Sequence, residues 1–127
     1  MAFFEVSRQV KRRLDLAADL PTDHPPVLGE IDALVDQLPD PEHLCAEERA
    51  GALAAVAKLR NRLDAYLTET AATADEHADS RVLGAGTTGM MVAVATGANP
   101  VVGSATVARG NALQYLPLVA ASFRAGK

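Results

Sequence analysis

The sequence has 127 residues, a formal net charge of −4, 49% hydrophobic residues and only 4% aromatic residues. This length suits one domain with a single core, and the apolar fraction argues against wholesale disorder. The single cysteine excludes an intramolecular disulfide framework and a cysteine-rich zinc site. Because alanine fills 25 positions, small side chains must supply the core, which favours closely packed helices over sheets. The composition therefore predicts an all-α fold.

Two short helices are predicted in the N-terminal part of the chain, residues 1–38. Apolar residues recur every three or four positions over residues 3–17, which is typical of an amphipathic helix. Prolines at positions 21, 25 and 26 end this helix and make residues 20–26 a linker. A second apolar stripe over residues 27–38 predicts another helix, which ends near Pro39.

One long helix is predicted over residues 40–80. Asp40 followed by Pro41 is typical of a helix start, with an N-cap residue before a proline at the first helical position. A helix that runs from there to Ser80 would be the spine of the domain or the seam of a dimer. Its apolar seam consists of Leu53, Val56, Leu59, Leu63, Tyr66 and Leu67.

A cluster of short helices is predicted over residues 86–126. Thr87 or Thr88 caps a helix that ends at Thr96-Gly97, and Asn99-Pro100 begins the next one. Leu116-Pro117 begins a last helix, for which Gly126 would be the C-terminal cap. The apolar face of the middle helix is expected to consist of Val101, Val102, Ala105, Ala108 and Leu113. The chain is thus predicted to be one helical domain, residues 1–127, with a long spine helix and several shorter ones.

Charge is divided unevenly along the chain. Residues 1–79 hold all 16 acidic residues and 8 basic ones, a net charge of −8. Residues 80–127 hold the other 4 basic residues and no acid, a net charge of +4. The C-terminal part therefore has the sign that a polyanion attracts, although the footprint is thin for phosphate contacts. A solvated face beside a low-charge core segment is the alternative interpretation.

Residues 82–108 carry no charge and are numerous enough to cross a bilayer. Threonine, asparagine, proline and glycine interrupt this segment, so a buried helical hairpin is favoured over a membrane-associated segment. The N-terminus lacks the basic region and apolar run of a secretory signal. We therefore expect a cytoplasmic protein without a membrane partner.

Residues 84–89 match the dinucleotide-binding pattern G-x-G-x-x-G, but no strand precedes them and no acid follows. These glycines are expected to form a turn and to permit close helix packing. The histidines His24, His43 and His77 are scattered, and Cys45 lies among acids. No nucleophile, base and orienting group can be assembled from the sequence. We therefore predict no catalytic centre, metal site, cofactor or small-molecule ligand.

The two helices over residues 88–97 and 99–113 have the outline of a helix-turn-helix, whose second helix can lie in the major groove of DNA. Arg109 and Asn111 are of the types that contact guanine and adenine edges. The second helix has only one positive charge, however, whereas phosphate contacts usually need several. A plain helical hairpin is the alternative.

Short motifs in a characteristic order give a family resemblance. They are Arg62-Leu63-Asp64-Ala65, Gly86-Thr87-Thr88, Thr96-Gly97, Asn99-Pro100, Leu116-Pro117 and Gly126-Lys127. Over residues 41–127 the chain resembles the N-terminal domain of unknown function of actinobacterial HNH-endonuclease-like proteins, including the mycobacterial 13E12 repeat group. Full-length members carry a C-terminal HNH motif, of which this sequence contains no His-Asn-His set. The sequence also lacks the several arginines that members commonly have after the position of Asn99-Pro100.

Two functional hypotheses follow. In the first, the chain is a noncatalytic module of an HNH-type protein that binds or positions duplex DNA through Arg81, Arg109, Asn111, Arg124 and Lys127. In the second, it is a helical self-association or protein-interaction module with no nucleic-acid role. That second module would form a homo-oligomer through the long apolar seam or through the small-residue stripe of Gly89, Ala93 and Gly97.

Overall fold

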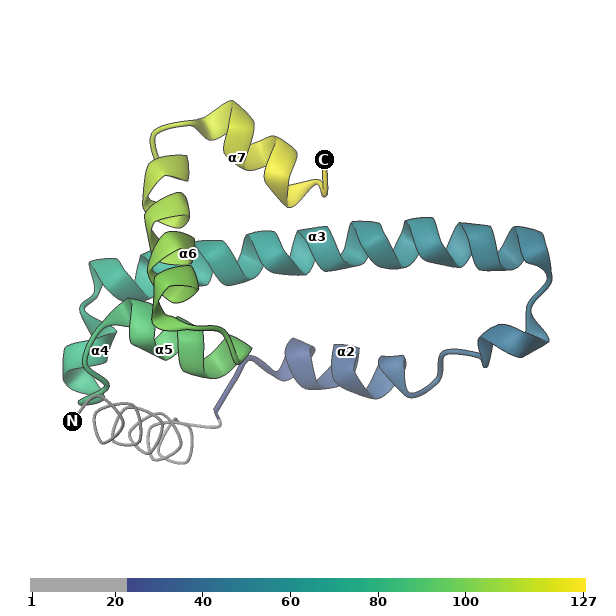
Figure 1. Ribbon diagram of the computed structural model, residues 1–127, viewed down its shortest axis with the longest axis horizontal. Coiled ribbons are helices and arrows are strands. Elements are labelled where there is room, and N and C mark those ends of the chain that lie inside the picture. The colour runs from purple at the N-terminus through teal and green to yellow at the C-terminus, as the bar shows by residue number, and fades with distance from the viewer. Residues whose placement is uncertain (1–22) are drawn as a thin grey trace, which may run out of the picture.

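The computed structural model describes residues 23–127, and the regular structure in this range is helical throughout (Figure 1). Helix α2 (Pro26–Val35) leads through the 3-10 turn η1 (Pro41–His43) into the long helix α3 (Ala46–Glu76), which runs back antiparallel to α2. The shorter helices α4 (Asp79–Val82), α5 (Thr88–Thr96), α6 (Pro100–Leu113) and α7 (Pro117–Arg124) follow. The predicted all-α fold with a long helix and shorter ones packed on it is confirmed. The helix predicted over residues 3–17 lies outside the described residues.

The long helix begins later than predicted. Asp40 does act as a cap, because its carboxylate accepts a hydrogen bond from the Glu42 N–H at 3.0 Å, but the element that it begins is η1. Cys45, in extended backbone, is the N-cap of α3. Its sulfur accepts a hydrogen bond from the Glu48 N–H at 3.5 Å, and the Glu48 carboxylate accepts one from the Cys45 N–H at 3.1 Å. This reciprocal capping box fixes the helix start, and its hydrogen bonds hold the pKa of Glu48 below its ordinary value.

The long helix also ends earlier than predicted. Its last residue is Glu76, and Ala78 has a φ of 53°, in the left-handed region. A residue with a Cβ occupies that region at a cost of about 1 kcal/mol. The turn that Ala78 makes separates α3 from the four-residue helix α4, so residues 40–80 do not form one helix.

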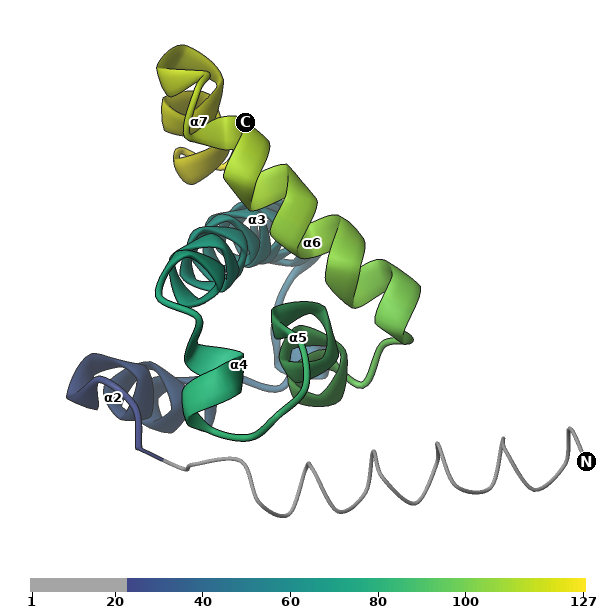
Figure 2. The same ribbon diagram turned by 90° about the vertical axis from the view of Figure 1, so that its left-hand side faces the viewer.

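The core lies where α5 and α6 pack against the C-terminal part of α3 (Figure 2). Its buried apolar side chains are alanines and valines: Ala65, Ala71, Ala72, Ala85, Val92, Ala93 and Val107. Thr68 is fully buried with them, and its hydroxyl donates a hydrogen bond to the Asp64 carbonyl at 2.9 Å. The expectation that small side chains supply the core is therefore confirmed.

Glycines bring the backbone of α6 against its neighbours. A Cβ on Gly103 would collide with the Gly89 carbonyl oxygen of α5, and one on Gly110 would lie 2.5 Å from the Thr68 carbonyl oxygen of α3. With Val107 these glycines form the buried face of α6. The predicted apolar face is wrong, because Val101 and Val102 are 78% and 50% exposed. Two glycines permit a closer approach between helices than two valines would.

The glycines of residues 84–89 act as predicted. Gly84 and Gly86 have φ values of 66° and 82° in the turn between α4 and α5, a conformation that glycine adopts without strain. Gly89 packs closely against α6, since a Cβ there would lie 3.0 Å from the Ser104 nitrogen. Gly89 and Ala93 are thus buried inside the fold. The small-residue stripe is therefore not the surface through which two copies would associate.

We expect Gly103→Ala to lower the free energy of unfolding by about 1–3 kcal/mol, because the added methyl group must displace the Gly89 carbonyl. Gly51 is the matched control, since it lies in α3 with no atom within 4 Å of its Cβ position. Gly51→Ala should raise the free energy of unfolding by about 0.5–1 kcal/mol. Urea denaturation followed by circular dichroism measures both values. Equal effects of the two substitutions would contradict the close approach of α6.

Candidate functional site

Helices α5 and α6 have the geometry of a helix-turn-helix. They are separated by three residues, 97–99, and are bent by 115°. Helix-turn-helix pairs meet at about 90–120° across a turn of this length. The Thr87 hydroxyl caps α5 by accepting a hydrogen bond from the Met90 N–H at 3.1 Å, and the Asn99 side chain caps α6 through the Val102 N–H at 3.0 Å. Both predicted caps are confirmed.

The outer face of α6 offers little to a polyanion. Val101, Ser104, Ala105 and Ala108 are exposed there, and Arg109 is the one cation of the helix. A surface of small and apolar side chains provides few of the contacts that position a protein on DNA. The geometry of a helix-turn-helix is therefore present without the charge that usually accompanies it.

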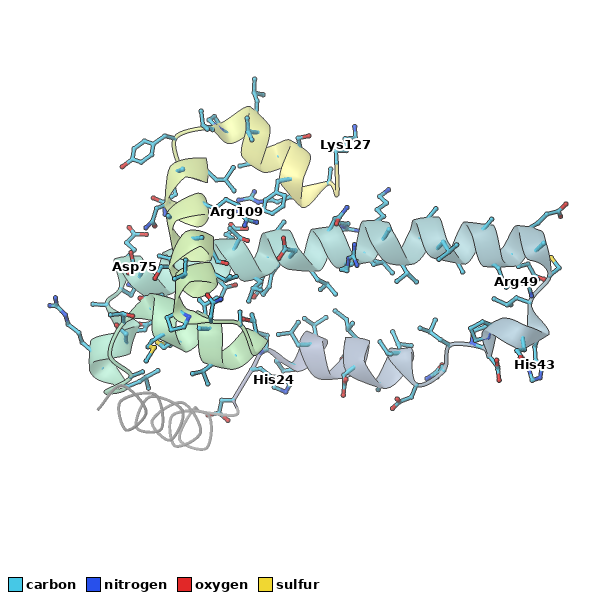
Figure 3. The ribbon with its side chains drawn as sticks, in the orientation of Figure 1. His24, His43, Arg49, Asp75, Arg109 and Lys127 are labelled. Carbon is cyan, nitrogen blue, oxygen red and sulfur yellow. The ribbon has the colours of Figure 1, made fainter. Side chains whose placement is uncertain are left out.

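Three of the five residues predicted to bind DNA contact acids of α3. The Arg109 guanidinium lies 3.8 Å from the Asp64 carboxylate, and the Asn111 amide donates a hydrogen bond to the Asp75 carboxylate at 3.2 Å. Figure 3 shows Arg109 and Asp75 close to where α6 crosses α3. The Arg124 guanidinium of α7 holds both oxygens of the third acid, Glu69, at 2.7 and 3.2 Å. The basic C-terminal part thus folds back onto the acidic part of the chain.

The other two predicted residues lie apart from these pairs. Arg81 is exposed on α4, and Lys127 is exposed at the end of the chain beyond α7. Helix α4 and the C-terminus lie on different sides of α3 in both ribbon views (Figures 1 and 2). The five residues therefore do not form one continuous basic patch.

The hairpin of α2 and α3 carries an exposed apolar surface. No residue of α2 is buried, and α3 buries none before Ala65. On α3, large apolar side chains at spacings of three, four and three residues are exposed: Val56 54%, Leu59 54%, Leu63 46% and Tyr66 50%. On α2 and the residues after it, the spacings are four, three and four: Val27 54%, Ile31 38%, Leu34 58% and Leu38 63%. We call these eight side chains the α2–α3 face.

The two apolar rows of the face enclose grooves. One groove, of about 460 Å³, has Val27 and Ile31 on one wall and Leu59 and Leu63 on the other. A second, of about 760 Å³, lies nearer η1 between Leu38 and the first turns of α3. Alternating spacings of three and four residues are typical of helices that pack side by side along a shared seam. The long seam predicted from the sequence is therefore present, but within the described residues it is largely open.

The histidines and the cysteine are dispersed over residues 23–127. No group of three His, Cys, Asp or Glu side chains comes together there to hold a metal ion. In Figure 3, His24 lies before the start of α2 and His43 lies in η1, beyond the other end of α2. Cys45 is exposed in its capping position.

Among the described helices, none by itself has the length and apolar character that a membrane span requires, although the bent pair of α5 and α6 meets both criteria together.

Sequence reasoning missed two features of these surfaces. It identifies an apolar stripe over residues 27–38 and a seam on the long helix, but it does not predict that the two lie opposite each other on antiparallel helices. It also missed the pairing of Glu69 with Arg124, which are 55 residues apart. The matching alternation of spacings on the two helices is a signal for the first feature, whereas no local signal reports the second.

Family models, curated proteins and solved structures were compared with the chain, and none of them matches it. A function must therefore be inferred from the surfaces themselves.

We expect Glu69 and Arg124 to couple by about 0.5–1 kcal/mol in a double-mutant cycle at low salt, because the pair is bidentate but half exposed. The variants are Glu69→Gln, Arg124→Gln and their combination, and the measurement is the free energy of unfolding in urea. Salt should weaken the coupling. Asp64 and Arg109, at 3.8 Å, form the matched pair and should couple less. A coupling that salt leaves unchanged would contradict an ion pair.

Proposed function

We propose that this chain is a noncatalytic helical module that associates with itself through the α2–α3 face. The observation that carries the proposal is the pair of exposed apolar rows, with alternating spacings, on two antiparallel helices. Such rows are buried in helical bundles and coiled coils. In a single copy these rows of large apolar side chains are exposed to water.

The size of the face supports the same conclusion. From their exposed fractions, the eight side chains present on the order of 800 Å² to water, which matches the area that each partner buries in a stable interface. The largest apolar patch of an ordinary monomer is about 300–600 Å². Helix α2 has ten residues and none buried, whereas isolated helices need about 12–15 residues to be even marginally stable in water. A second copy over the face would supply the burial that α2 lacks.

The place of the face in the fold also favours association. The hairpin of α2 and α3 extends away from the cluster of α4, α5 and α6 (Figure 1). Burial in α3 is confined to residues from Ala65 onward, so the cluster has its core at one end of the long helix. The other end is a pair of helices whose apolar rows have no described partner within the chain.

We expect the mass of the wild-type chain to rise from monomer to dimer over about 1 to 200 μM, as measured by light scattering after size exclusion. Leu63→Asp should raise the dissociation constant at least about 100-fold, because association would bury an unpaired carboxylate. Leu118→Asp is the matched control, since Leu118 is 86% exposed on α7, away from the face, and should associate like the wild type. Circular dichroism should show both variants folded. A wild-type monomer at every concentration would contradict the proposal.

A second candidate function is DNA binding or positioning by the C-terminal part of the chain. The 115° bend and three-residue turn of α5 and α6 support it, as does the resemblance to the N-terminal domain of HNH-endonuclease-like proteins. Arg81 and Lys127 are exposed for phosphate contacts, whereas Arg124 would first have to leave Glu69. DNA would thus compete with the ion pairs that hold the C-terminal helices on α3.

We expect any binding to a fluorescently labelled duplex to weaken steeply between about 50 and 200 mM salt, as fluorescence anisotropy would report. Arg81→Ala should reduce the salt slope by about one, because one phosphate contact is lost. Glu69→Gln should strengthen binding, because it releases Arg124. Val101→Ala, on the same end of the molecule but without charge, is the control. Absence of salt-sensitive binding at micromolar protein would contradict the DNA function.

A further inference from the structure

Charges beside the α2–α3 face are complementary between its two helices. Helix α2 carries Glu30 and Asp32, with Asp36 directly after it, and no basic residue. Residues 58–62 in the middle of α3 carry three basic residues and no acid. The two ion pairs found within residues 23–127 involve none of these groups. Beside the face, α2 is therefore acidic and the middle of α3 is basic, and neither set of charges forms an ion pair within residues 23–127.

A second copy can cover the face in two symmetric ways. If the two-fold axis runs parallel to the helices, each α2 lies on the α3 of the other copy, and all neighbouring helices are antiparallel. If the axis runs across the helices, α2 lies on α2 and α3 lies on α3. The two copies present the same patch in both cases, as a two-fold interface requires. The charges on α2 and α3 distinguish the two symmetric arrangements.

Charge favours the parallel axis. It places the acidic α2 of one copy beside the basic middle of α3 of the other, and the symmetry repeats this contact. The crossing axis would place Glu30, Asp32 and Asp36 opposite the same three acids, and like charges across an interface are penalised. Figure 2 shows α5 and α6 on one side of α3 and α7 on the other, where a Cβ on Gly126 would lie 3.1 Å from the Lys58 carbonyl oxygen. Figure 1 shows that none of these helices reaches the half of the α2–α3 hairpin near η1. A second hairpin has room there.

We propose that two copies form an antiparallel four-helix bundle about a two-fold axis parallel to the helices, with α2 of each copy on α3 of the other. This proposal rests on the proposed self-association and specifies the partner surface of the same face. Four-helix bundles pack such rows at small crossing angles. Glu30 and Arg60 flank the rows of their helices and would select this pairing over the alternative.

Cys45 marks the end of the hairpin and distinguishes the two arrangements. It is the single cysteine of the chain, is exposed and caps α3. About the parallel axis the two Cys45 residues lie at the same end of the bundle, within about 20 Å of each other at ordinary interhelical distances. About the crossing axis they lie at opposite ends. Cys45 precedes Arg60, in the middle of the row, by 15 residues, or about 22 Å at 1.5 Å per residue, so the two would then be about 45 Å apart.

The test is the distance between nitroxide labels on Cys45 of the full chain, measured by double electron–electron resonance at a concentration where light scattering shows a dimer. A distribution centred below about 30 Å supports the parallel axis, since label linkers add several ångströms to the spacing of two helices. A dimer with a distribution near 45 Å overturns this arrangement but leaves self-association standing. A monomer overturns both proposals.

Charge reversal provides an independent readout. On the parallel axis Glu30→Lys and Arg60→Glu should each raise the dissociation constant of the dimer about 10-fold, and the double variant should restore it. Glu76→Lys, on an exposed acid at the far end of α3, is the control and should leave the constant unchanged. On the crossing axis Glu30→Lys would instead tighten the dimer, because it removes repulsion between the two α2 helices. Tightening by Glu30→Lys therefore overturns the proposed arrangement.

Discussion

Backbone contact between α6 and its two neighbours determines the rest of the fold. Gly103 lies against the Gly89 carbonyl of α5, and Gly110 lies against the Thr68 carbonyl of α3. Because backbone meets backbone, no side chain larger than hydrogen fits at either point, and α6 can approach α5 and α3 closely only through these glycines. Helix α7 follows from the end of α6, so Arg124 reaches Glu69 only because α6 crosses α3 at this place. The ion pairs are consequences of the close packing and not its cause.

The two ends of the described molecule differ in the size and the burial of their apolar side chains. The cluster of α4 to α6 is closed by alanine, glycine, threonine and valine, whereas most of the leucines of α2 and α3 face water. Cores usually contain the large apolar side chains, because their burial contributes most to stability. Because small residues form the core of this chain, its large apolar side chains remain exposed and are available for contact with another molecule. Under the self-association proposal the α2–α3 hairpin becomes a second core, completed by two copies.

Signals that act between sequence neighbours predicted the local structure well. Thr87 and Asn99 cap the helices expected of them, and Gly97 ends α5 in a left-handed conformation. Prediction from the sequence failed where contacts between residues far apart in the chain determine which side chains are buried. The sequence pattern predicts a buried face of α6 made of Val101, Val102, Ala105, Ala108 and Leu113, because such a pattern ranks helix faces by hydrophobicity. The face actually buried contains Gly103 and Gly110, which only the proximity of α5 and α3 makes advantageous.

The candidate sites show the same limit. The division of charge predicted an acidic part and a basic part, but it could not show that they fold together. Arg124 neutralises Glu69, and Arg109 lies near Asp64, so much of the basic C-terminal part is paired internally. DNA binding must displace these acids, which lowers its net gain in free energy. The acids of α2 have no ion-pair partner within the described residues. These unpaired acids lie beside the α2–α3 face. The apolar side chains of that face are also exposed, so a binding partner could satisfy both the charges and the apolar surface.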